Sequence, residues 1–193
     1  MTNFRIGTVP SIAVHKFGGA SLADATAVSH AVDIAMAQDS QSVIVVSALA
    51  GVTDALLEGA RRAASGEERV LRDTSAELRE RHRAIIMKLL RATPERRSLL
   101  AEIDEAMAEL DALAHGLAVL RELTPRTSDY VASRGERLSA RIVAAALTKA
   151  GRRAQFVDGP DVIRTNGQFG GWTTSRFPLL RTSGASGVSW RFS

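Results

Sequence analysis

The chain has 193 residues, of which 45% are hydrophobic and 24% charged, and its formal net charge is +4. These proportions predict a globular domain with its own core and exclude a disordered chain. The sequence contains no cysteine, which excludes disulfides and thiolate metal sites. Residues 1–9 have no signal-peptide pattern, and no apolar run reaches the roughly 20 residues that a membrane helix needs. We therefore expect a cytoplasmic protein without a membrane partner.

The small basic excess raises the question of nucleic-acid binding. Through the middle of the chain, arginine alternates with glutamate and aspartate, a pattern typical of solvated helix faces. We therefore expect no nucleic-acid partner. Salt-dependent binding to DNA would be the evidence for one.

The first elements predict a strand–helix–strand unit. Residues 12–15 are apolar and lead into a glycine turn at 16–19, so we expect a buried strand that ends there. Residues 21–24, Ser-Leu-Ala-Asp, match a loose capping signal, and we expect Ser21 to begin a helix. The β-branched run 43–46 predicts a second buried strand. This order implies a parallel sheet and an α/β fold.

A long helical region follows. Gly51–Asp54 opens a helix that we expect to end near Ala64, and residues 67–121 are helical and charged, with a break at Thr93-Pro94. Each side of the break has its own apolar stripe, so we expect an antiparallel helical hairpin inserted into the α/β domain. The stripes comprise Leu71, Leu78, Ile85 and Leu89, and then Leu100, Ile103, Met107, Leu110 and Leu113.

The last elements are a helix, a strand and a different tail. Ser133 and Glu136 have capping-box spacing, which predicts a helix from Ser133 to about Ala150. Residues 154–157 predict a third short strand, followed by Asp158. From Val162 to the end there is no acidic residue and no strand–helix alternation, so the composition changes inside what should be the middle of a doubly wound sheet.

The glycine turn is a candidate anion site. Backbone N–H groups at Gly18 and Gly19 can approach a phosphate, the following helix dipole favours negative charge, and Lys16 adds a cation. The segment matches neither the Walker A loop nor the dinucleotide-binding turn. A plain tight turn is the alternative.

Three polar side chains are candidates for a ligand site at the carboxyl ends of the strands, where open α/β sheets bind ligands. Ser47 and Thr53 can donate hydrogen bonds, and Glu136 can hold an ammonium group. The alternatives are that Thr53 only caps its helix and that Glu136 only completes a capping box. The four histidines have no metal-ligand spacing, so we expect no metal site.

Four segments together resemble the aspartate kinase family. Residues 16–21, Lys-Phe-Gly-Gly-Ala-Ser, resemble the Lys-Phe-Gly-Gly-Thr-Ser signature, and residues 46–54 resemble the second segment. Residues 133–139 are similar to the Ser-x-Gly-Glu-x-x-Ser segment, and residues 157–170 resemble the stretch after it. The order agrees, over residues 12–171. The long insert and the segment 122–126 are most similar to the branch fused to homoserine dehydrogenase.

The resemblance implies an amino-acid-kinase-like fold, an open and mostly parallel sheet with flanking helices. It implies transfer of a phosphoryl group from MgATP to the β-carboxylate of L-aspartate, giving 4-phospho-L-aspartate in the first step of lysine, threonine and methionine biosynthesis. Mg²⁺ would be bound mainly through the substrate phosphates, and full-length members form homo-oligomers. By the same resemblance, the catalytic residue is Lys16, the ATP phosphates are bound by Lys16, Gly18, Gly19 and Ser21, and aspartate is bound by Ser47, Thr53 and Glu136.

The sequence departs from the family in two ways. Ala20 replaces the usual threonine of the signature, and no counterpart of the later Gly-Arg-Gly-Gly-Ser-Asp segment or of the regulatory domains is present. We therefore expect residues 10–171 to be the N-terminal part of a kinase domain, inactive alone, with its helical insert at about 67–121. Residues 172–193 are expected to be an irregular tail that is out of frame or otherwise unrelated to the family, and a genuine divergent tail is the alternative. The alternatives are a non-catalytic interaction or regulatory module, and a carbamate or glutamate kinase, against which the Ser-x-Gly-Glu segment argues.

Overall fold

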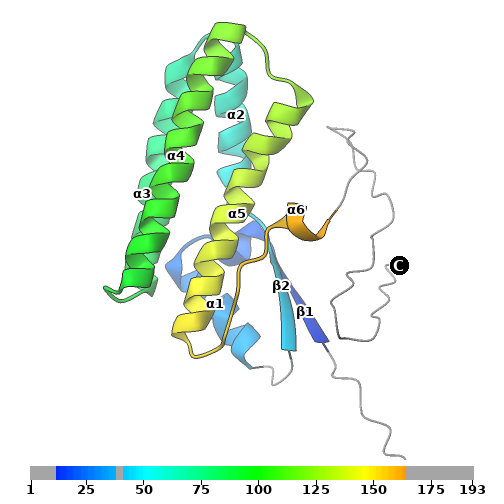
Figure 1. The fold of residues 1–193 in the computed structure, drawn as a ribbon, viewed down its shortest axis with the longest axis vertical. Helices are drawn as coiled ribbons and strands as arrows, with labels where there is room; N and C mark the ends of the chain where they lie inside the picture. Colours follow the sequence, from blue (N-terminus) through cyan, green and yellow to red (C-terminus); the bar gives the residue numbers. More distant parts are fainter. Residues whose placement is uncertain (1–11, 38–40, 164–193) are drawn as a thin grey trace, which may run out of the picture.

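A small parallel sheet is joined to a layer of long helices in the computed structural model, which describes residues 12–37 and 41–163 (Figure 1). The α/β class that the sequence predicts is confirmed, although helix predominates. The elements in chain order are β1 (Ile12–Phe17), the 3₁₀ turn η1 (Gly19–Leu22), α1 (Ala25–Met36), β2 (Gln41–Val46), α2 (Val52–Ala64), α3 (Glu68–Leu89), α4 (Pro94–Leu120), α5 (Pro125–Lys149) and α6 (Gly159–Val162).

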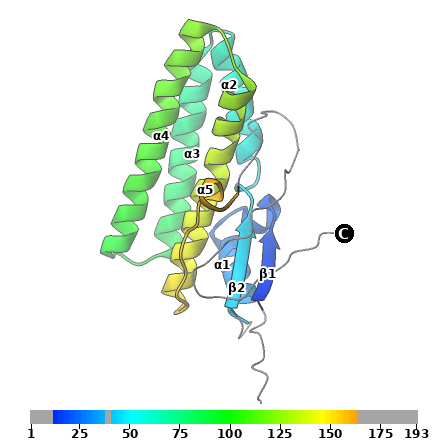
Figure 2. The same ribbon diagram turned by 45° about the vertical axis from the view of Figure 1, so that its right-hand side comes forward.

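The two strands pair in parallel, from Ile12 opposite Gln41 to Phe17 opposite Val46. Their carboxyl ends point toward the helical layer (Figure 2). The predicted burial of both strands is wrong for one face of the sheet in the described residues, where Val14 is 50% exposed. The reason is that the described helices cover only the opposite face, on which Phe17 and Ile44 join the core.

The predicted third strand at 154–157 is also wrong. In the described structure this segment is extended but is not paired with the sheet. This segment, β2 and α5 together line a cavity of about 650 Å³, and the segment does not join the edge of β2. It packs on α5 instead, where the Arg141 guanidinium lies 4.5 Å from the centre of the Phe156 ring.

The predicted hairpin is confirmed as α3 and α4, which lie side by side (Figure 1). Thr93 caps α4 by accepting a hydrogen bond from the Arg96 N–H, and Pro94 occupies the first turn. Arg83 of α3 contacts Asp104 of α4 at 2.8 Å. The two helices of the hairpin are therefore held together by buried apolar side chains and by an ion pair between them.

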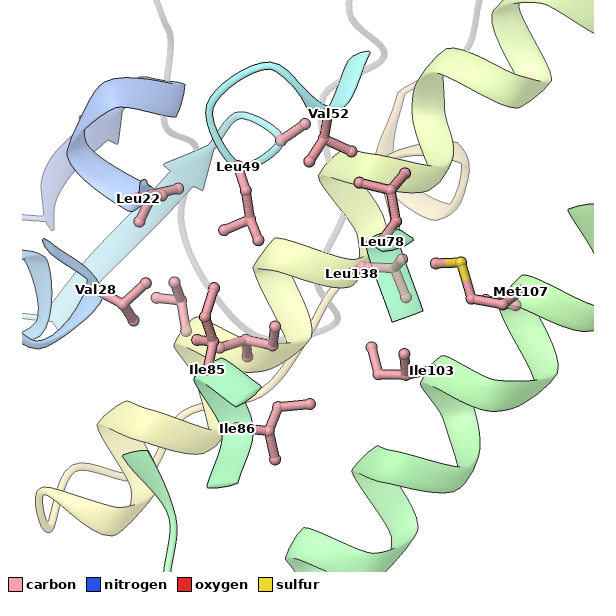
Figure 3. Close-up of a cluster of buried hydrophobic side chains, with 14 of the residues drawn as sticks. Leu22, Val28, Leu49, Val52, Leu78, Ile85, Ile86, Ile103, Met107 and Leu138 are labelled. Atoms are coloured by element: carbon pink, nitrogen blue, oxygen red, sulfur yellow. The ribbon is translucent and has the colours of Figure 1, made fainter. Parts of the chain in front are cut away.

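One hydrophobic core connects the hairpin to the sheet and to the loops at its carboxyl edge. Figure 3 shows side chains from η1, α1, the loop after β2, α2, α3, α4 and α5 meeting in one cluster. Leu49 and Val52 are each 1% exposed and belong to this cluster. Two buried side chains thus anchor the loop after β2 and the start of α2 in the core.

Two predicted helix starts are wrong. The first α-helix begins after Asp24, whose carboxylate accepts the N–H groups of Thr26 and Ala27 at 2.8 and 2.9 Å, and not at Ser21. These hydrogen bonds, that of Ala27 first, lower the pKa of the Asp24 carboxyl. The last long helix begins at Pro125 with Thr124 as its cap, so Ser133 lies well inside it.

His82 provides a test of the core. Its side chain is 0% exposed, and Nδ1 lies 2.7 Å from the Leu78 carbonyl oxygen, while Nε2 has no partner in the described structure. Burial lowers the pKa of this histidine, the hydrogen bond to Leu78 opposes that shift, and the charge of Arg81 adds to it. The lowered pKa favours the neutral ring at pH 7, and because a carbonyl oxygen can only accept, the contact with Leu78 then places the proton on Nδ1.

We expect the free energy of unfolding to fall as the pH drops below the ordinary histidine pKa of about 6.5, by at most about 1.4 kcal/mol per pH unit. In that window the unfolded chain binds a proton at His82 and the folded chain does not, so acid favours unfolding. The fall ends once the pH passes the lowered pKa. Urea unfolding between about pH 7.5 and 5 measures this slope. His82→Leu should remove it and His30→Gln, at an exposed histidine, should keep it; a slope unchanged in His82→Leu contradicts the prediction.

Candidate functional site

Two candidate residues meet at the carboxyl edge of the sheet. Lys16 is near the end of β1 and Ser47 directly follows β2, and Lys16 Nζ lies 3.2 Å from Ser47 Oγ. The Ser47 N–H donates to the Phe17 carbonyl at 3.0 Å, which continues the parallel pairing by one residue. The pairing thus brings residues distant in sequence into contact and leaves the Lys16 side chain exposed to a ligand.

The glycine turn lies beside this pair, and its two glycines have different surroundings. A Cβ at Gly19 would lie 3.0 Å from the Ala48 carbonyl oxygen, so this glycine allows the turn to pack against the loop after β2. A Cβ at Gly18 would be in ordinary contact, 3.9 Å from Lys16 Nζ. The turn is closed by the Ser21 N–H, which donates to the Gly18 carbonyl at 3.0 Å, and the Ser21 residue is exposed.

The expected contribution of a helix dipole at this turn needs correction. Residues 19–22 form a single 3₁₀ turn, and the first α-helix begins only at Ala25. Its first N–H groups are already bound by the carboxylate of Asp24. An anion at Gly18 and Gly19 would therefore be held by Lys16 and by the amides of the turn, not by the end of α1.

Residues 133–139, the third of the four segments that resemble the family, lie on α5 and contact the loop after β2. A Cβ at Gly135 would lie 2.7 Å from the Ala48 Cβ and 2.8 Å from Val52 Cγ1, so the absence of a side chain lets α5 approach the loop closely. One turn later, the buried Ser139 Oγ donates to the Ser47 carbonyl oxygen at 2.6 Å. The loop that carries Ser47 is thus seated directly on α5.

For Glu136 and Thr53, helix capping was the alternative to ligand binding, and neither residue caps a helix. Glu136 lies in the interior of α5, next to Gly135, and is exposed. The residue that caps α2 is Gly51, in the left-handed region with φ 75°, and Thr53 follows at the second helical position, partly buried. Both capping alternatives are wrong.

Sequence reasoning missed Arg137. Its guanidinium pairs with the carboxylate of Asp158. This pair brings the start of the segment 157–170 beside the segment 133–139. The sequence does contain a signal for this pair, because Arg137 directly follows Glu136 and Asp158 directly follows the predicted strand at 154–157. The remainder of the fourth motif, residues 164–170, and the tail at 172–193 lie outside the described residues.

Within the described ranges, no three histidine, aspartate or glutamate side chains gather closely enough to hold a metal ion. The same ranges contain no helix that is both long and apolar enough to cross a membrane.

Comparison with known proteins identifies the family. The model of the amino acid kinase family matches residues 11–184. The chain belongs to the amino acid kinase family. Among curated members, the chain is 32% identical to the chloroplastic bifunctional aspartokinase/homoserine dehydrogenase 1 of Arabidopsis thaliana, over 79% of this chain and 17% of that protein. It is 31% identical to the lysine-sensitive aspartokinase 3 of Escherichia coli, over 82% of this chain and 33% of that protein.

Solved structures agree with this assignment. The crystal structure of E. coli aspartokinase III in complex with aspartate and ADP superposes with a TM-score of 0.71 at 30% identity, covering 83% of this chain and 34% of that one. The complex of the same enzyme with lysine and aspartate gives a TM-score of 0.70 over 82% of this chain and 34% of that one. The resemblance to aspartokinases is confirmed, and the chain spans about a sixth to a third of the length of these relatives.

Proposed function

We propose that this chain binds L-aspartate and MgATP at the carboxyl edge of β1 and β2 and serves phosphoryl transfer to the β-carboxylate, giving 4-phospho-L-aspartate. The observation that carries the proposal is the 3.2 Å contact between Lys16 Nζ and Ser47 Oγ. The loop that contains Ser47 packs against α5 at Gly135 and Ser139. The complex of E. coli aspartokinase III with aspartate and ADP supports aspartate and an adenine nucleotide as the ligands.

Lys16 suits the phosphoryl group. Its ammonium is exposed at a strand end beside the open Gly18, so it can approach the γ-phosphate oxygens and offset their charge. In the proposed step a carboxylate oxygen of aspartate forms a bond to the γ-phosphorus and the bond to the bridging oxygen of ADP breaks. The acceptor carboxylate is already ionised, so positioning and charge neutralisation supply the catalysis and no general base is required. Mg²⁺ would be held mainly by the phosphates and would neutralise part of their charge.

The three remaining candidates suit aspartate. Its two carboxylates can accept hydrogen bonds from the hydroxyls of Ser47 and Thr53, and its ammonium can pair with the exposed Glu136 carboxylate. The positive Lys16 then pairs with the phosphates of ATP and the negative Glu136 with the ammonium group of aspartate, which orients the two substrates. Ser139 holds the Ser47 backbone and is a positioning residue in this scheme.

Lys16→Met tests the proposal. Loss of the ammonium should weaken MgATP binding by roughly 10-fold or more, because hydrogen bonds to charged groups contribute about 1.5–3 kcal/mol. Isothermal titration of the wild-type chain and of Lys16→Met, with Lys149→Met at the exposed end of α5 as the control, measures the change. Equal affinity in all three chains would contradict the role of Lys16.

Binding is measured before turnover because the relatives carry most of their length outside the matched region. We propose that residues 10–171 form the N-terminal part of the kinase domain, and that turnover requires the parts that the relatives have in addition. Trapping of an acyl phosphate by hydroxylamine measures turnover. L-aspartate binding without MgATP binding would favour the non-catalytic module.

The homo-oligomer and the cytoplasmic location stay predictions. Light scattering after size exclusion tests the oligomeric state.

A further inference from the structure

A side chain from the helical hairpin bridges the two loops of the site. The guanidinium of Arg81, on α3, donates one hydrogen bond to the Ala50 carbonyl at 2.8 Å and another to the Ala23 carbonyl at 2.9 Å. Ala23 ends the turn that contains Gly18 and Ser21, and Ala50 lies in the loop between Ser47 and Thr53. One partly buried group therefore contacts both loops that carry the proposed ligand-binding residues.

The chemistry of arginine suits this bridge. Its guanidinium is planar, always charged and has several N–H donors in a fixed geometry, so its two terminal nitrogens can donate to two carbonyls at once. Arg81 meets the loops from the helical side. On the same loops, Gly19 packs against the Ala48 carbonyl at a distance that leaves no room for a side chain. The distance between the loops is thus set by the Gly19 contact and by Arg81.

The position of Arg81 is determined by the hairpin. Neighbouring residues of α3, Leu78 and Ile85, lie in the core, and Arg83 pairs with Asp104 of α4. Arg81 thus belongs to an element inserted into the α/β unit, yet contacts the two loops at the carboxyl edge of the sheet. A shift of α3 relative to the sheet would move both loop carbonyls.

We infer that Arg81 is a positioning residue that holds the turn at 18–23 and the loop at 47–52 at the separation required for the contact between Lys16 and Ser47, and that it couples the α3–α4 hairpin to the site. Arg81 acts through the loop backbones. The predicted effect on substrate affinity rests on the proposed function, whereas the predicted effect on the loops does not.

Hydrogen exchange of the whole chain tests the effect on the loops. In Arg81→Met, we expect the amides of residues 18–24 and 47–52 to exchange roughly 10-fold faster, as expected for the loss of hydrogen bonds from a charged group. Arg83→Met is the matched control, because Arg83 is on the same helix and its guanidinium pairs with Asp104 of α4. We expect it to leave both loops within about two-fold of the wild-type rate. Arg81→Lys, which keeps a charged donor, should restore part of the protection.

The affinity for L-aspartate is the second measurement, by isothermal titration. It should fall by roughly 5-fold or more in Arg81→Met and stay within about two-fold in Arg83→Met. Unchanged loop exchange in Arg81→Met would overturn the inference, as would equal acceleration in Arg83→Met or acceleration spread evenly over all helices. If the wild-type chain does not bind L-aspartate, the proposed function fails, and loop exchange alone still decides the role of Arg81.

Discussion

Replacing Glu136 with glutamine should weaken L-aspartate binding by about 10- to 100-fold, which is the effect of losing a hydrogen bond between two charged groups. Glu136 is exposed in the interior of α5 and the structure gives it no capping role, so the protein does not need its charge to fold. We therefore expect the free energy of unfolding to change by less than about 0.5 kcal/mol. A loss of affinity without a loss of stability distinguishes a binding residue from a structural one.

Isothermal titration with L-aspartate measures the affinity, and urea unfolding measures the stability. Glu77→Gln is the control, because Glu77 is also an exposed glutamate inside a long helix, and it should bind aspartate as the wild type does. If Glu136→Gln binds L-aspartate as tightly as Glu77→Gln, the proposed partner of the substrate ammonium is wrong.

Replacing Gly135 with alanine should destabilise the protein by about 1–3 kcal/mol, the usual cost of overpacking a core. Glycine to alanine inside a helix normally stabilises by up to about 1 kcal/mol. Here the new methyl group would lie 2.7 Å from the Ala48 Cβ and 2.8 Å from Val52 Cγ1. Both neighbours are buried, at 4% and 1% exposure, so they cannot move aside without disturbing the core. The steric effect therefore exceeds the gain in helix propensity.

Gly116→Ala is the matched control, since it lies inside α4 and a Cβ there would have no neighbour within 4 Å. It should stabilise the protein by roughly 0.5–1 kcal/mol. Urea unfolding of both variants gives effects of opposite sign if α5 packs against the loop as described. A Gly135→Ala protein as stable as Gly116→Ala would show that α5 and the loop after β2 are farther apart.

The elements predicted correctly from the sequence have local patterns that run over many residues. The apolar stripes on both sides of Thr93-Pro94 placed the hairpin, and Gly51 placed the start of α2. Periodicity and caps of this kind depend on neighbours within a few positions, so tertiary contacts rarely reverse them.

The errors arose where a short pattern had a competitor nearby. Ser133 and Glu136 fit a capping box, but Thr124 and Pro125 provide an earlier start and α5 continues through Gly135. At the first helix, Asp24 provides the cap in place of Ser21. Residues 154–157 predict a short strand, but strand pairing depends on a partner edge that the segment does not join.

The sequence by itself determined the candidate residues, because Lys16, Ser47, Thr53 and Glu136 stand in ordered motifs that resemble one family. Only the tertiary structure decided how these motifs meet. The contact of Lys16 with Ser47 spans 31 positions, and the two hydrogen bonds of Arg81 span 31 and 58. Contacts at such separations depend on how the sheet, α5 and the hairpin pack together, and no local pattern records that packing.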